Sequence, residues 1–375
     1  MGARRPVLGV AAFVAIALGA WALVRGGATE APTGAAAPSA SPATPTPIAK
    51  LDFHVHIDAE IAPAARTFLR AHGIGRAVNL SGGWVGAGLE ETLAAAGGDP
   101  VFANVDFRGI GAPGWSEREV LRLERAKAMG ARGVKIPKSL GLRVHTPDGR
   151  RVAVDDPLLD ALFDAMGRLG LPLAIHTGDP RAFFDPPTRD NERYEELGAH
   201  PAWSFSDRSV YPTWDALLGE LERRVARSSR TSIVSVHFGN APEEPARVAR
   251  WLDRYPNLWV DTAARVPELG HRAQEARAAI LAHPDRVLFG TDLQFGSDGS
   301  LVLGAGEGFG HRREGVERFF TSTWRFFETR DRGFAHPTPI QGAWTIDGIG
   351  LPRDVLERVY HANAERLLGL GPTPL

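Results

Sequence analysis

The sequence predicts a (β/α)8 barrel, a TIM barrel with long loops after strands five and eight, on three observations. Eight short apolar segments follow one another from residue 51 onward, and helix-like segments separate them. Each connection is long enough to return the chain for a parallel strand. The span from residue 51 onward suits this fold, which takes about 250 residues and more with insertions. A doubly wound open sheet is the alternative, but the first strand precedes neither a phosphate-binding glycine fingerprint nor a P-loop.

The predicted strands are short and rich in apolar residues. Residues 51–58 show the clearest pattern, because every second residue there is apolar, as in a strand with two different faces. The eight predicted strands cover residues 51–58, 76–80, 101–106, 133–137, 171–176, 233–237, 258–261 and 287–292.

Helix signals fill the connections between these strands. Ser116 and Glu119 have the spacing of a capping box, which predicts a helix that runs to Met129 and stops at Gly130. The remaining predicted helices cover residues 59–71, 89–96, a segment after 157, 213–226, 243–254 and 267–282. Two insertions, 178–211 and 293–351, are too long for plain connections, and the second is expected to contain a helix near residues 315–330.

The composition restricts the classes of function. A hydrophobic content of 43% and a charged content of 23% are those of a globular protein. The formal net charge of −1 and the lack of a basic run argue against nucleic acid as a partner. Cysteine is absent, so any metal ion must bind to His, Asp, Glu or a modified side chain.

The N-terminus has the pattern of an export signal. Arg4 and Arg5 precede an apolar run over residues 7–24, which predicts a signal peptide over 1–25. An uncleaved anchor that holds the protein in the membrane through residues 7–24 is the alternative. Residues 26–48 are rich in Ala, Pro and Thr and predict a disordered linker before a barrel domain over 49–375. We therefore expect a periplasmic, extracellular or membrane-anchored protein.

Polar residues stand near the ends of the predicted strands. His54 and His56 share one face of the first strand, and Lys135, His176, His237 and Asp292 follow in later strands. The C-terminal ends of barrel strands build active sites. Burying so many titratable groups is costly unless something compensates their charge, and a divalent cation would do so.

Alternation along the strands also predicts the direction of each side chain. Val134 and Ile136 are expected to face the helices, so Lys135 should face the barrel interior. By the same reasoning Val234 and Val236 are expected to point outward and His237 inward.

This order of polar residues resembles that of the amidohydrolase superfamily. The resemblance extends from Leu51 to Leu368 and includes the Asn363-Ala364 pair near the C-terminus. It is strongest to the branch that includes the aminocarboxymuconate-semialdehyde and resorcylate decarboxylases. It implies one divalent metal ion, for which we expect Zn²⁺, bound by a set of four residues: His54, His56, His176 and Asp292. If the site holds two ions, the resemblance implies that His237 and a carboxylated Lys135 also bind metal.

The expected function is metal-dependent hydrolysis of an ester, lactone or amide bond in a small, aromatic or carboxylated substrate. Asp292 would take a proton from water, and His237 or Lys135 would stabilise the oxyanion. Two alternatives stay open. One is a non-oxidative decarboxylase of an aromatic or unsaturated acid, and the other is a barrel that keeps the metal site without catalysis. Whether the chain forms a homo-oligomer also stays open.

Overall fold

The structure is a computed structural model that describes residues 46–304 and 313–375. Residues 47–375 form one compact unit. The predicted signal segment over 1–25 and nearly all of the predicted linker over 26–48 lie outside the described residues, as does the apolar run over 7–24. Among the helices that are described, none is long and apolar enough to cross a membrane.

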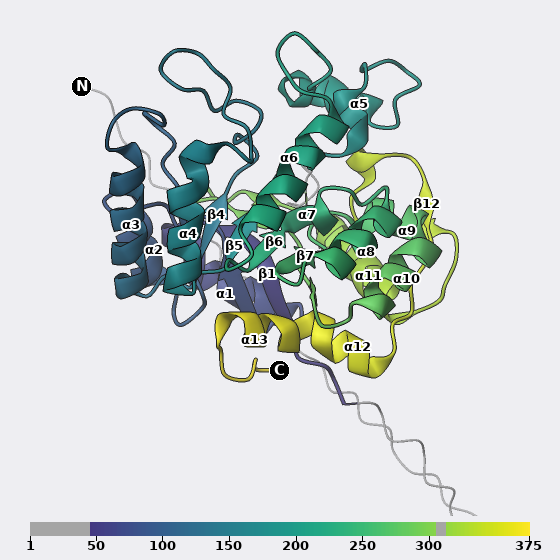
Figure 1. The fold of residues 1–375 in the computed structure, drawn as a ribbon. Helices are drawn as coiled ribbons and strands as arrows, with labels where there is room; N and C mark the ends of the chain where they lie inside the picture. The colour runs from purple at the N-terminus through teal and green to yellow at the C-terminus, as the bar shows by residue number, and fades with distance from the viewer. Residues whose placement is uncertain (1–45, 305–312) are drawn as a thin grey trace, which may run out of the picture. The chain divides into compact units, whose positions relative to one another are not determined.

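Eight parallel strands form the barrel. Figure 1 labels β1 and β4 to β7 among them. One hydrogen-bonded ladder pairs β1 with β2, and a second joins β3 through β8 in chain order. Two hydrogen bonds close the seams between them: Asn79 N donates to Pro100 O and Phe53 N donates to Phe289 O, each at 2.9 Å. The strands are β1 (Leu51–Ile57), β2 (Arg76–Asn79), β3 (Phe102–Asn104), β4 (Gly133–Ile136), β5 (Leu173–Ile175), β6 (Ile233–Ser235), β7 (Leu258–Asp261) and β8 (Val287–Leu288). The predicted (β/α)8 fold is confirmed.

Helices surround the barrel and fill its insertions. The α-helices are α1 (Ala62–Ala71), α2 (Leu89–Ala95), α3 (Trp115–Met129), α4 (Asp160–Leu169), α5 (Tyr194–Ala199), α6 (Trp214–Arg227), α7 (Val236–Gly239), α8 (Pro245–Arg254), α9 (Val266–His271), α10 (Ala273–Ala282), α11 (Arg313–Glu328), α12 (Arg353–Glu357) and α13 (Asn363–Leu368). Shorter turns are η1 (Ala59–Ile61), η2 (Pro157–Leu159), η3 (Arg181–Phe184), η4 (Pro201–Trp203), η5 (Pro339–Gln341) and η6 (Arg358–Ala362). In Figure 1, α5 lies at the end of the barrel opposite to α12 and α13.

The eighth predicted strand is interrupted. β8 ends at Leu288, and a further strand, β9 (Leu293–Phe295), pairs in parallel with the second half of β1. Between them, Asp292 has a left-handed backbone with φ of 62°. Because this conformation breaks an extended chain, the prediction of one continuous strand over residues 287–292 is wrong. β10 (Leu301–Val302) then pairs with β9, and β11 (Phe334–Ala335) pairs with β12 (Thr345–Ile346), all antiparallel.

The start of α3 also differs from its prediction. The helix begins at Trp115 behind Gly114, and Ser116 lies inside the first turn, where its hydroxyl donates to Leu158 O. Glu119 is buried and accepts from the backbone N–H of Asp106 instead of closing a capping box. The predicted stop at Gly130 is confirmed, with φ of 108°.

The core has two layers around the barrel wall. Val134 and Ile136 belong to the outer cluster beneath the helices, as predicted, and Leu173 lies in the same cluster. Val234 and Val236 belong instead to the inner cluster, together with Phe53 and other residues that fill the barrel. Val234 is registered with Ala174, the neighbour of Lys135, so these positions share the inner face. The prediction that Val234 and Val236 point outward is therefore wrong.

We predict that Asn363→Ala lowers the free energy of unfolding by about 2 kcal/mol, because one buried and one partly buried carbonyl lose their donor. Asn363 Nδ2 donates to Pro284 O at 2.9 Å and to Val287 O at 2.8 Å, which attaches α13 to the start of β8. Urea unfolding would measure the loss. The exposed Asp354→Ala is the control, with an expected change within about 0.5 kcal/mol. Equal stability of the two variants would refute the structural role of Asn363.

Candidate metal centre

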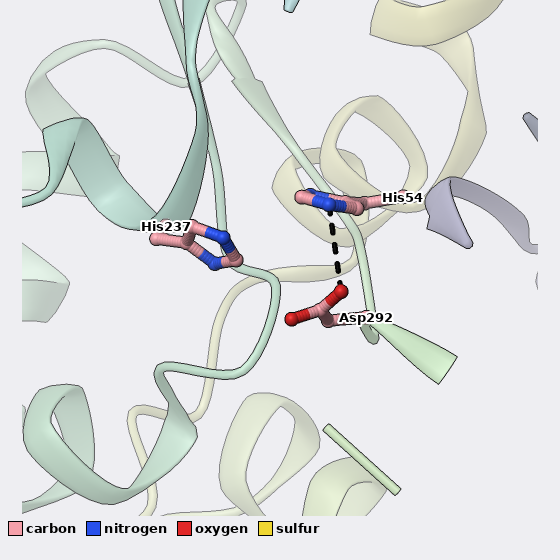
Figure 2. A group of neighbouring side chains, drawn as sticks. All are labelled: His54, His237 and Asp292. Carbon is pink, nitrogen blue, oxygen red and sulfur yellow. Dashed lines mark ion pairs between the residues drawn. The ribbon is translucent and has the colours of Figure 1, made fainter. Parts of the chain in front are cut away.

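His54 lies at the centre of a group of titratable side chains. It is fully buried on β1, and its Nδ1 lies 2.8 Å from Asp261 Oδ2. Because the partner is a carboxylate, Nδ1 carries the proton and Nε2 keeps its lone pair. Nε2 faces Asp292 Oδ1 at 3.5 Å, the ion pair drawn in Figure 2. A Cβ at Gly290 would lie 3.0 Å from His54 Cβ, so glycine gives the imidazole room.

His56 turns its Nε2 toward the same point. Its Nε2 lies 3.3 Å from His54 Nε2 and 3.2 Å from Asp292 Oδ1. Its Nδ1 lies 2.7 Å from the hydroxyl of Ser81, which follows β2. The prediction that the two histidines share one face of β1 is confirmed.

His237 reaches the group by a strained turn. It follows β6, and both His237 and Phe238 have left-handed backbones, with φ of 57° and 55°, so the short element α7 is a left-handed turn and not a regular α-helix. Its Nδ1 lies 2.8 Å from the carbonyl of Ala263, which can only accept, so Nδ1 is the protonated nitrogen and Nε2 is free. Single ligand atoms of His54, His237 and Asp292 lie within 4.8 Å of one another (Figure 2). These three residues could hold a metal ion.

His176 and Lys135 complete the group from β5 and β4. The His176 ring centroid lies 4.3 Å from that of His237, and its Nε2 lies 3.5 Å from Asp179 Oδ1. Lys135 Nζ is buried and has no hydrogen-bond partner within the described part of the chain, and the buried Nε2 of His176 has only its long contact with Asp179. A buried polar atom without a partner is costly, so the Lys135 amine calls for a missing partner.

Burial and neighbouring charges shift the pKa values of these groups. Burial lowers the pKa of His176 to about 4 and that of Lys135 to about 8. Burial also lowers the pKa of His237 well below its ordinary value. Asp292 behaves differently: burial would raise its pKa, but His54, His56 and Lys135 hold it at about 2. At neutral pH His176 and His237 are therefore neutral imidazoles and Asp292 is an ionised carboxylate, the protonation states that metal ligands need.

A cavity of about 370 Å³ opens above this group. His54 lies beneath the cavity. The other five predicted site residues line it: His56, Lys135, His176, His237 and Asp292. Phe183 and Trp203 from the long loop after β5 form part of its wall, as do Gln294 and Gln341. The structure thus brings every predicted site residue to one place.

Sequence reasoning missed several residues around the site. Asp261 is absent from the predicted site, yet it ends β7 just as Asp292 follows β8, and this place at a strand end is the signal that could have identified it. Ser81, Asp179 and Arg265 each follow a strand within a few residues, but nothing in the sequence separates them from ordinary loop residues. Lys138 pairs with Asp179 at 2.7 Å inside the cavity and was also missed.

A barrel with a histidine-rich group at its mouth that could hold a metal ion is an arrangement typical of barrel enzymes. A family model described as amidohydrolase matches residues 64–370, and the chain belongs to that family. Members of the family act on small molecules, and this chain is an enzyme of the amidohydrolase superfamily. No curated protein matches the chain significantly.

Solved structures with a similar fold are distant in sequence. An uncharacterized TIM-barrel protein from Bordetella bronchiseptica is 18% identical, with 86% of this chain and 99% of that chain covered and a TM-score of 0.48. The 5-carboxyvanillate decarboxylase from Sphingomonas paucimobilis is 13% identical, with coverage of 87% and 100% and a TM-score of 0.49. An amidohydrolase from Burkholderia multivorans is 18% identical, with coverage of 86% and 100% and a TM-score of 0.40.

We predict that Asp261→Asn weakens zinc binding about 10- to 100-fold, because the amide no longer fixes the tautomer of His54 as the carboxylate does. Competition with a chromogenic chelator would measure the affinity. Asp164→Asn is the matched control, since Asp164 forms a surface ion pair with Arg230. Unchanged zinc affinity in Asp261→Asn would show that the carboxylate does not support a metal ligand.

Proposed function

We propose that this protein is a metal-dependent hydrolase that cleaves an ester, lactone or amide bond in a small substrate. The observation that carries the proposal is Lys135, a buried amine at the mouth of the barrel that has no hydrogen-bond partner among the described residues. A lysine whose pKa is lowered to about 8 has a larger neutral fraction than an ordinary lysine. The neutral amine can add to carbon dioxide, forming an N–C bond and releasing a proton.

The residues present fit a divalent metal centre. His54, His56, His176 and Asp292 would hold one ion, and His237 with a carboxylated Lys135 would contribute to a second. The nitrogens His54 Nε2 and His56 Nε2 approach within 3.3 Å, and a cation between such lone pairs would stabilise the contact. We propose zinc because the site is rich in histidine and has no thiol. Bound zinc supplies Lewis acidity toward water and toward a carbonyl oxygen.

The side chains divide the remaining work. Asp292 stays ionised and faces the cavity, so it can accept a proton from the attacking water and pass it to the leaving group. His237 keeps Nε2 unprotonated, because Nδ1 donates to Ala263 O, so Nε2 can bind a metal ion or accept a proton, and the developing negative charge is left to the metal and to Lys135. His54 is held by Asp261 below the cavity, where it positions the others without contacting a substrate.

A decarboxylase is the second candidate, and the cavity wall is the observation that favours it. The rings of Phe183 and Trp203 stack with centroids 6.3 Å apart and would accommodate an aromatic acid. Such a reaction would release carbon dioxide from the substrate and consume no water in the net reaction. Lys135 distinguishes the two proposals, because only the hydrolase uses it as a carboxylated bridge.

We further propose that the protein is exported. The basic residues Arg4 and Arg5 before the apolar run over 7–24 support this location. Fractionation of cells that express the full chain, with mass measurement of its N-terminus, would distinguish a cleaved signal from an uncleaved anchor.

We predict that Lys135→Ala lowers the metal content from about two ions per chain to about one and reduces hydrolysis at least about 100-fold, because the bridge between the ions is lost. Elemental analysis of protein purified without added metal gives the first value, and a panel of lactones, esters and amides gives the second. Lys127→Ala on α3 is the control. One ion in both wild type and Lys135→Ala would contradict the bridge and favour the decarboxylase.

We predict that Asp292→Asn retains most of the bound metal but loses turnover by at least about 100-fold, since an amide cannot accept the proton. The measurement is kcat on the best substrate of the panel, together with metal content. Full activity in this variant would show that another group is the base.

A further inference from the structure

This inference rests on the proposed hydrolase and concerns its substrate. Arg265 follows β7 and lines the same cavity as the histidine group. It is only 3% exposed, so it is almost completely removed from bulk water. Ala264, the residue before it, has a left-handed backbone with φ of 54°. Arg265 Nη1 donates to the carbonyl of Ala264 at 2.9 Å.

The charge of Arg265 has no direct partner. Its Nε is buried and makes no hydrogen bond, and no carboxylate of residues 46–304 or 313–375 forms an ion pair with its guanidinium. Two nearby acids have other partners: Asp179 pairs with Lys138 at 2.7 Å and Glu196 with Arg193 at 2.9 Å. Glu243 and Asp292 act on Arg265 through their charge, without an ion-pair contact. A buried guanidinium that contacts no carboxylate is costly, so its presence in a cavity indicates a ligand.

The position of Arg265 relates it to the reaction site. Burial and neighbouring positive groups, Arg265 among them, lower the pKa of His237. Asp292 is likewise close enough to influence the pKa of Arg265, which burial lowers. The guanidinium therefore shares the cavity with the groups that would carry out hydrolysis.

We propose that Arg265 binds a carboxylate of the substrate, so that the enzyme acts on a carboxylated ester, lactone or amide. A guanidinium offers a planar set of donors that matches the two oxygens of a carboxylate. The aromatic wall of Phe183 and Trp203 would contact the apolar body of the substrate. Arg265 is thus a specificity-determining residue that holds the substrate at a second point, away from the bond that breaks.

The test compares two probes, isophthalate and benzoate, which differ by one carboxylate. Calorimetry on metal-loaded protein would give Kd values for wild type and for Arg265→Gln. We expect the substitution to weaken isophthalate binding about 10- to 100-fold and to change benzoate binding less than about threefold, because only isophthalate reaches both the metal centre and Arg265. Arg265→Lys should weaken isophthalate binding by a smaller factor, because lysine keeps the positive charge but lacks the paired N–H donors of the guanidinium.

Stability provides an independent readout. Removing an unpaired buried charge should leave the Tm of Arg265→Gln unchanged or raise it, whereas a structural arginine would lower the Tm. Arg224→Gln is the matched control, because Arg224 is equally buried but hydrogen-bonded to Val154 O, Asp156 O and Asp160. We expect this control to lose stability and to leave the isophthalate preference unchanged.

The proposal is overturned if wild-type protein shows no preference for isophthalate, or if Arg265→Gln weakens both probes equally. A lower Tm with an unchanged preference would also overturn it and leave Arg265 as a structural residue. These measurements need no turnover, so their outcome is separate from that of the proposed hydrolysis. If the enzyme is an active hydrolase but binds isophthalate equally well with and without Arg265, this inference is refuted while the proposed hydrolysis stands.

Discussion

The carboxylate of Asp261 is the interaction on which the candidate site depends. It is fully buried at the end of β7 and accepts from three donors: His54 Nδ1 at 2.8 Å, His237 N at 2.7 Å and Ala263 N at 3.1 Å. One side chain therefore sets the tautomer of one histidine and the backbone position of another. A second buried carboxylate, Asp52, accepts from the backbone N–H groups of His54 and Thr291 and so holds β1 beside the segment that carries Asp292.

Backbone strain is concentrated at the same end of the barrel. The five non-glycine residues with left-handed backbones in the described part of the chain all follow β6, β7 or β8: His237, Phe238, Asn240, Ala264 and Asp292. Each such residue costs about 1–3 kcal/mol and persists only where the surroundings enforce it. Here the enforcing elements are the closed barrel and the two buried carboxylates. The strained turns aim side chains at one point that regular strands could not reach together.

Regular patterns in the sequence predicted part of the site, and irregular backbone turns account for what was missed. The order of the strands follows from the repeated strand–helix pattern. The inward Lys135 and the meeting of His54 with His56 follow from period-2 alternation along a strand. The inward Val234 and the break at Asp292 escaped prediction because left-handed turns, not alternation, orient His237 and Asp292. Ser116 and Glu119 matched a capping pattern, yet burial of Glu119 against Asp106 and Arg122 outweighed it. Such tertiary competition leaves no trace in residue spacing.

The balance of charge at the barrel mouth connects the two proposals. Most acidic groups there have partners, since Asp179 pairs with Lys138, Glu196 with Arg193 and Asp261 with His54. Carboxylation would change Lys135 from a cation to an anion and thereby offset part of the charge of the metal. Arg265 would still face the cavity without an ion pair to a described carboxylate. This buried positive charge favours a substrate that carries a negative charge.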